Sequence, residues 1–180
     1  MSVLDPIVWP IAQKFHGFQV ETPSGKRLRR IGEEYVDDTT LTTALPDNTK
    51  EKDEFKTITD LMEAIIQDFE RKLHVTGGEL SLPKSFWYLI YWNWEENGTA
   101  TLATKDEAPG EIYLTQGEGT EKTKLTRKEY DSSMRTLGAM VCSAKKMNKQ
   151  VEHTTKQCET WKCAMENNKL TRDCSYKAYN

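Results

Sequence analysis

The stretch "IGEEYVDDTTL", residues 31–41, places two adjacent aspartates directly after a short apolar pair. The aspartates are Asp37 and Asp38, and the pair is Tyr35 and Val36. The stretch "RLRRIGEEYV", residues 27–36, predicts a pair of strands that closes at the aspartates, although two glutamates weaken the pattern. Two carboxylates at such a turn repel each other unless cations lie between them. Acidic pairs are also common in solvated turns, so the pair alone leaves both interpretations open.

The polar connector after this stretch leads into a strongly periodic segment. Apolar residues recur there every three or four positions, which predicts one apolar face of a helix. These residues are Phe55, Ile58, Leu61, Met62, Ile65, Ile66, Phe69 and Leu73. Gly77 and Gly78 follow and predict the end of the helix. We expect its apolar face to pack on the sheet that carries Tyr35 and Val36.

The remaining segments predict short strands and then a second helix. Six aromatic residues fall between Phe86 and Trp94. They favour a buried strand, and the alternative is a row of exposed rings that stack on bases. Further strands are predicted in "TATLAT" (99–104), "EIYLTQGEGTEKTKL" (111–125) and "MRTLGAMVC" (134–142). From about residue 148 the pattern is helical, with an inner stripe at Val151, Thr155, Cys158, Trp161 and Met165. This order predicts an α+β fold with a helical tail.

Composition limits the class of protein. No apolar run approaches the roughly 18–20 residues of a membrane span. The start of the chain lacks the basic and apolar segments of a signal peptide. We therefore expect an intracellular protein, cytoplasmic or nuclear, with its four cysteines reduced.

Charge is distributed unevenly along the chain. Residues 1–120 carry 12 Lys+Arg and 21 Asp+Glu, a balance of −9, whereas residues 121–180 carry 13 and 7, a balance of +6. The acidic part could hold cations and the basic part could meet phosphates. A solvated surface of mixed charge is the alternative for each part.

The motifs "YVDDTTL", "TGGELSLPKSFWYLI", "DEAPGEI" and "RTLGAMV" occur in this order. The first resembles the aspartate box of reverse transcriptases, and the last resembles their primer-gripping element. The combination is similar to retroelement reverse transcriptases of algal and diatom genomes, and it extends from about Ile31 onward. The resemblance implies part of a polymerase palm, an antiparallel sheet with a packed helix, over residues 1–145. A truncated helical segment like a polymerase thumb would follow at 146–180.

The resemblance also implies an activity and its participants. The activity is RNA-templated DNA synthesis at a two-magnesium site, with an RNA template and a DNA primer as partners. Asp37 and Asp38 would be the catalytic metal ligands for Mg²⁺, and Lys84 would donate a proton to the leaving pyrophosphate. Residues expected to contact nucleic acid are Tyr35, Leu137, Gly138, Lys145, Lys146 and Lys149.

A two-metal polymerase site needs a further aspartate from an earlier palm strand. Only 36 residues precede Asp37, and the sole aspartate among them is Asp5, whose setting differs from that strand. We therefore expect a missing N-terminal fingers and palm portion, and a fragment that is inactive alone. The alternative is a non-catalytic remnant that binds nucleic acid or protein.

Overall fold

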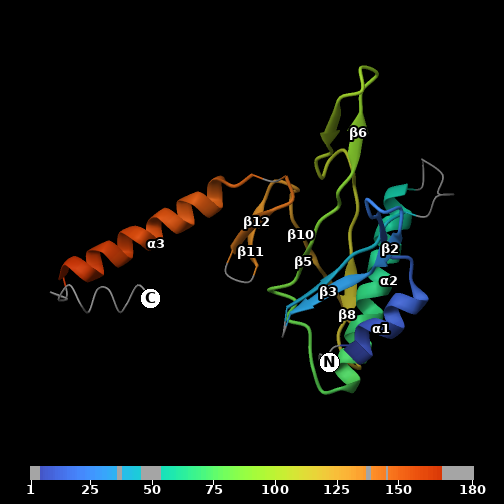
Figure 1. The fold of residues 1–180 in the computed structure, drawn as a ribbon. Coiled ribbons are helices and arrows are strands. Elements are labelled where there is room, and N and C mark those ends of the chain that lie inside the picture. Colours follow the sequence, from blue (N-terminus) through green and yellow to red (C-terminus); the bar gives the residue numbers. More distant parts are fainter. Residues whose placement is uncertain (1–4, 36–37, 46–53, 137–138, 145, 168–180) are drawn as a thin grey trace. The chain divides into compact units, whose positions relative to one another are not determined.

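The computed structural model has an α+β fold, as the sequence predicts (Figure 1). The chain separates into two compact units, residues 1–128 and 129–180. The predicted boundary between residues 145 and 146 lies inside the second unit. The structure describes residues 5–35, 38–45, 54–136, 139–144 and 146–167.

The described part of the first unit contains two helices and ten short strands. The helices are α1 (Asp5–Lys14) and α2 (Glu54–Val75). The strands before α2 are β1 (Phe18–Glu21), β2 (Arg27–Arg30), β3 (Gly32–Tyr35) and β4 (Asp38–Leu41). The strands after it are β5 (Phe86–Trp87), β6 (Trp92–Trp94), β7 (Ala100–Leu102), β8 (Tyr113–Thr115), β9 (Lys122–Lys124) and β10 (Thr126–Arg127).

Within the described ranges the strands form two-stranded pairs instead of the single antiparallel sheet that we expected. In the first unit β1–β2, β3–β4, β6–β7 and β8–β9 are antiparallel, whereas β5–β10 is parallel. Short strands explain the difference, since two to four residues per strand leave few backbone groups for a third partner.

Helix α2 is the centre of the first unit and confirms the helix predicted from Phe55 to Leu73. Ile65 and Phe69 are buried in one cluster with Ile7 and Ile11 of α1 and Ile31. The predicted packing of the apolar face of α2 on the sheet at Tyr35 is therefore only part of the arrangement, because α1 also packs against this face. On the other side Met62 and Ile66 pack against a second cluster, Leu82, Trp87, Ile112, Leu114 and Leu125.

The two glycines after α2 end the helix as predicted. Gly77 has a φ of 84°, in the left-handed region that glycine adopts without strain. The Gly77 N–H donates to the carbonyl of His74 at 2.9 Å, and the Gly78 N–H donates to that of Leu73 at 3.0 Å. These bonds satisfy two of the carbonyl groups that the last helical turn leaves open.

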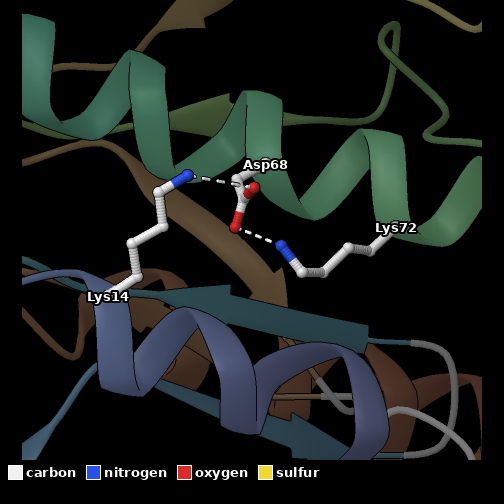
Figure 2. A network of polar contacts seen from close by, with 3 residues as sticks. All are labelled: Lys14, Asp68 and Lys72. Atoms are coloured by element: carbon white, nitrogen blue, oxygen red, sulfur yellow. Dashed lines mark hydrogen bonds and ion pairs between the residues drawn. The ribbon is translucent and has the colours of Figure 1, made fainter.

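An ion network joins α1 to α2 (Figure 2). Lys14 donates to Asp68 Oδ1 at 3.3 Å, and Lys72 donates to Asp68 Oδ2. Burial raises the pKa of Asp68, but the hydrogen bonds and charges of Lys72 and Lys14 outweigh it and hold that pKa below its ordinary value. The network therefore favours the ionised carboxylate at neutral pH.

The second unit contains β11 (Ser133–Thr136), β12 (Ala139–Cys142) and α3 (Asn148–Asn167). The side-chain oxygen of Gln150 accepts the backbone N–H of Met140 at 2.6 Å, which ties the start of α3 to β12. The predicted helix is confirmed, but its inner stripe is wrong. Val151 and Trp161 are 62% and 64% exposed, because the described part of this unit offers only one hairpin for α3 to pack against.

The described helices include none that combines the length and apolar character required to cross a bilayer.

Candidate functional site

The aspartate motif lies on the β3–β4 hairpin. The register pairs Gly32 with Leu41 and Tyr35 with Asp38. Val36 and Asp37 therefore connect two paired strands, and both lie outside the described residues. Asp38 is exposed at the first position of β4. Residues 27–36 contain two strands as predicted, but these do not pair with each other: β2 pairs with β1, and β3 pairs with β4.

The base of this hairpin is fixed to the first unit. Ile31 is buried, and its carbonyl accepts the N–H of Thr42 at 2.6 Å. A Cβ at Gly32 would stand 2.7 Å from the carbonyl oxygen of Thr40, so only glycine allows this approach of the strands. The Thr43 hydroxyl donates to the carbonyl of His16 at 2.7 Å. These contacts give Asp38 a defined position relative to α1.

The carboxylates near the motif do not complete a metal site. Glu33, on β3, forms an ion pair with Arg30 and is exposed. In the described parts of the chain, no three His, Cys, Asp or Glu side chains gather closely enough to hold a metal ion. Asp37 lies outside the described residues, so that statement does not include it. The described residues thus contribute Asp38 as one of the two predicted ligands and add no third.

Lys84, the predicted proton donor, lies in a turn after Pro83. Its backbone N–H donates to the carbonyl of Ser81 at 2.9 Å, and its side chain is exposed. Among the interactions of the described residues, no hydrogen bond or ion pair joins Lys84 to Asp38.

The predicted primer-gripping residues lie on the hairpin of the second unit. The register pairs Thr136 with Ala139, so Leu137 and Gly138 connect β11 and β12. Leu137, Gly138 and Lys145 are outside the described residues. This hairpin has the same arrangement as β3–β4: a two-residue segment of the motif joins directly paired strands.

Two of the predicted phosphate-binding lysines have acidic neighbours. Lys146 donates to Asp131 at 3.1 Å, and this hydrogen bond raises the pKa of Lys146. Lys149 donates to Glu152 at 3.3 Å. All four side chains are exposed. Exposed ion pairs contribute at most about 1 kcal/mol, so a phosphate can replace these carboxylates at small cost.

The aromatic segment divides between core and surface. Trp87 is 6% exposed, and the guanidinium of Arg127 lies 5.0 Å from its ring centroid. Trp92 and Trp94 are 48% and 74% exposed on β6. The predicted buried strand is correct for Trp87 and wrong for Trp92 and Trp94. The reason is that the described residues provide no second layer over this face of the β6–β7 pair.

A polar row on α2 was not apparent from the sequence. Glu63 accepts the N–H of Tyr113 at 2.9 Å, and Gln67 both accepts the N–H of Thr115 at 2.9 Å and donates to its carbonyl at 2.8 Å. Glu70 accepts the N–H of Gly117 at 2.9 Å and is 1% exposed. The three side chains take the place of a further strand along the edge of β8. Their spacing of four and then three residues, beside the apolar face, is the signal that could have revealed them.

No model of a known protein family matches the chain, and no curated protein or solved structure matches it.

Proposed function

We propose that these residues form part of a reverse transcriptase palm followed by the start of its thumb. In this proposal the segment descends from an enzyme of RNA-templated DNA synthesis and binds an RNA–DNA duplex, but does not extend a primer alone. The proposal rests on the resemblance of four motifs in order. The single structural observation that supports it is the β3–β4 register, with Tyr35 paired to Asp38 across the two-residue connection.

That register is compatible with the turn that the motif implies. In the proposal Asp37, in the connection, and Asp38, at the first position of β4, would both offer carboxylate oxygens to Mg²⁺. Mg²⁺ prefers oxygen ligands in octahedral geometry and usually keeps several waters, which phosphate oxygens can replace. Two such ions could activate a primer hydroxyl and stabilise the leaving oxygen. In the proposal Lys84 would protonate the leaving pyrophosphate.

The carboxylate count is the reason for expecting no extension by this segment alone. Two ions held by two adjacent carboxylates have few protein ligands, and Asp38 belongs to no described cluster of three. The incoming nucleotide must also be oriented, and orientation can contribute several orders of magnitude to a rate.

Duplex binding would come from the second unit. Lys146 and Lys149 lie close in sequence to the Leu137–Gly138 connection, and their exposed partners are readily exchanged for phosphates. Lys145 would act with them. Phosphate contacts release counterions, so log affinity falls with log salt by roughly 0.9 per neutralised phosphate on duplex DNA. A non-catalytic remnant that binds nucleic acid through the same lysines is the alternative.

One experiment tests both parts. The chain is assayed for extension of a DNA primer on an RNA template with Mg²⁺ or Mn²⁺, and for binding of the same hybrid by fluorescence anisotropy over a salt series. We expect binding without extension. Replacing Lys145, Lys146 and Lys149 together by glutamine should weaken binding and flatten the salt slope by up to about 3, equally for different sequences.

A matched control removes the same charge from the first unit by replacing the exposed Lys26, Lys56 and Lys122 by glutamine. It should leave the slope nearly unchanged. Absence of binding at low salt would overturn the proposal. Robust extension that Asp37→Ala abolishes would instead show an active polymerase. If the control variant lost as much affinity and salt dependence as the Lys145, Lys146 and Lys149 variant, the result would show only a general effect of net charge.

A further inference from the structure

Two hairpins of the first unit present exposed apolar faces with opposite charge. The basic ribbon is β1–β2, residues 18–30, which carries four Lys or Arg and one Glu, a balance of +3. The tryptophan ribbon is the β6–β7 region, residues 90–107, which carries one Lys and four Asp or Glu, a balance of −3. The basic ribbon lies outside the motifs that support the proposed function, and the tryptophan ribbon shares only Ile90, Asp106 and Glu107 with them.

The face of the basic ribbon follows from its register. Phe18 pairs with Arg30 and Val20 pairs with Leu28, so these four side chains share one face. Phe18, Val20 and Leu28 are 51%, 45% and 42% exposed. Arg30, which also pairs with the exposed Glu33, thus borders an exposed apolar row of three residues.

The tryptophan ribbon has a matching arrangement. Trp92 pairs with Leu102 and Trp94 pairs with Ala100. The small Ala100 leaves Trp94 as the most exposed aromatic of the ribbon, and Ile90, before β6, is 53% exposed. Glu95 and Glu96 follow Trp94 directly.

The turn of the tryptophan ribbon is held in shape by its own hydrogen bonds. The Glu95 N–H donates to the carbonyl of Thr99 at 2.9 Å, and the Gly98 N–H donates to that of Glu95 at 2.9 Å. The Asn97 side chain accepts the N–H of Thr99 at 2.7 Å. A turn with this many internal bonds loses little freedom when a partner binds.

We infer that the chain associates with a second copy of itself, with the basic ribbon of one copy on the tryptophan ribbon of the other. Every copy carries both faces, and their apolar rows and their charges are complementary. Guanidinium groups also favour tryptophan faces. A two-stranded hairpin is only marginally stable in water, so covering these faces stabilises both. Nucleic acid fits the tryptophan ribbon poorly, because its phosphates would meet the carboxylates.

The inference does not depend on the proposed function. Sedimentation velocity over a concentration series of the full chain tests it. We expect association that grows with concentration and weakens at high salt. Trp94→Ser and Val20→Ser should each weaken it at least tenfold. Trp9→Ser, at a residue 67% exposed on α1 and outside both ribbons, should not change it. Circular dichroism checks that each variant remains folded.

Mixing the two variants gives the sharpest result. Trp94→Ser keeps the basic ribbon and Val20→Ser keeps the tryptophan ribbon, so an equimolar mixture should form a mixed dimer more strongly than either variant associates alone. A chain that stays monomeric at every concentration would overturn the inference. So would association of Val20→Ser at the strength of the parent, which would indicate tryptophan ribbons meeting each other. A mixture that does not associate would also exclude the two ribbons as the contacting faces. So would a Trp9→Ser variant whose association weakens as much as that of the ribbon variants.

Discussion

The buried carboxylate of Glu70 should be a main support of the packing between α2 and the segment after β8. It is 1% exposed, and it accepts the N–H of Gly117 at 2.9 Å. Gly117 has a φ of 54°, and a Cβ there would stand 3.2 Å from the ring of His74, so this position favours glycine and is closely covered. Replacing Glu70 by leucine keeps most of the volume but removes the acceptor.

The magnitude follows from the loss of this acceptor. A hydrogen bond to a charged group contributes about 1.5–3 kcal/mol, and a buried N–H without a partner costs a comparable amount. We expect Glu70→Leu to lower the free energy of unfolding by about 2 kcal/mol. Glu70→Gln retains an oxygen that can accept the same N–H, and should cost less than about 1 kcal/mol.

Urea unfolding followed by tryptophan fluorescence measures the effect. With an m-value of about 2 kcal/mol per molar, the midpoint of Glu70→Leu should fall by roughly 1 M. Hydrogen exchange gives a local readout, since the amide of Gly117 should exchange faster in Glu70→Leu and nearly as in the parent in Glu70→Gln. A leucine variant with the midpoint of the parent would refute the role of the carboxylate. A glutamine variant as unstable as the leucine variant would show that the charge, and not the acceptor, matters.

Two further predictions concern α2. Ile65→Ala opens a cavity at a residue with 0% exposure and should lower the unfolding free energy by about 2–5 kcal/mol in urea titration, whereas Val75→Ala, 86% exposed, should change it by less than about 0.5. Equal effects would show that this face is not core. The lowered pKa of Asp68 means that its ion network stabilises the fold above the unfolded pKa of about 3.9 and loses this contribution as pH falls through the folded pKa. The stability difference between the parent and Asp68→Asn should therefore be constant above about pH 5 and shrink below about pH 4; a difference that does not change with pH would exclude this mechanism.

The sequence predicted the helices and turns whose structure depends on residues that are close together in the chain. The apolar period from Phe55 to Leu73 predicted α2 because a helix face repeats every 3.6 residues wherever it packs. Gly77 predicted the end of α2 because its left-handed backbone is set by the neighbouring turn. The strands before the two aspartates were predicted from the stretch at residues 27–36, although their pairing partners were not. Each of these depends on residues within a few positions of one another.

The parts that the sequence did not predict depend on distant partners. Whether Trp87 or Trp94 is buried depends on what lies over each strand, and both share the same aromatic segment. The edge of β8 is satisfied by Gln67, which is 48 residues away from Thr115. The pattern of polar and apolar residues along α2 does not predict this contact, because polar residues on a helix usually face water.

In the candidate site, too, some features depend on neighbouring residues and others depend on residues far away in the sequence. The sequence places Asp37 and Asp38 together by adjacency alone, and the β3–β4 register agrees with the predicted turn. The distance from Asp38 to Lys84, or to any third carboxylate, is set by tertiary packing, and no described contact joins Asp38 to either. A motif can therefore suggest the chemistry, while the number of ligands that converge decides whether the chemistry occurs.

Helix α3 has little tertiary support, because none of its 20 residues is buried against the rest of the second unit. Helices of such length gain most of their stability from tertiary packing, and the exposed pairs Lys149–Glu152 and Lys162–Glu166 each add only about 0.2–0.5 kcal/mol. The bond from the Met140 N–H to Gln150 ties its first turn to β12. A helix with so little support gains stability when its face is covered, and in the proposed function an RNA–DNA backbone would cover the side that carries Lys149. Binding and ordering of α3 are then coupled, which lowers affinity for a given contact area but lets the helix adapt to the duplex.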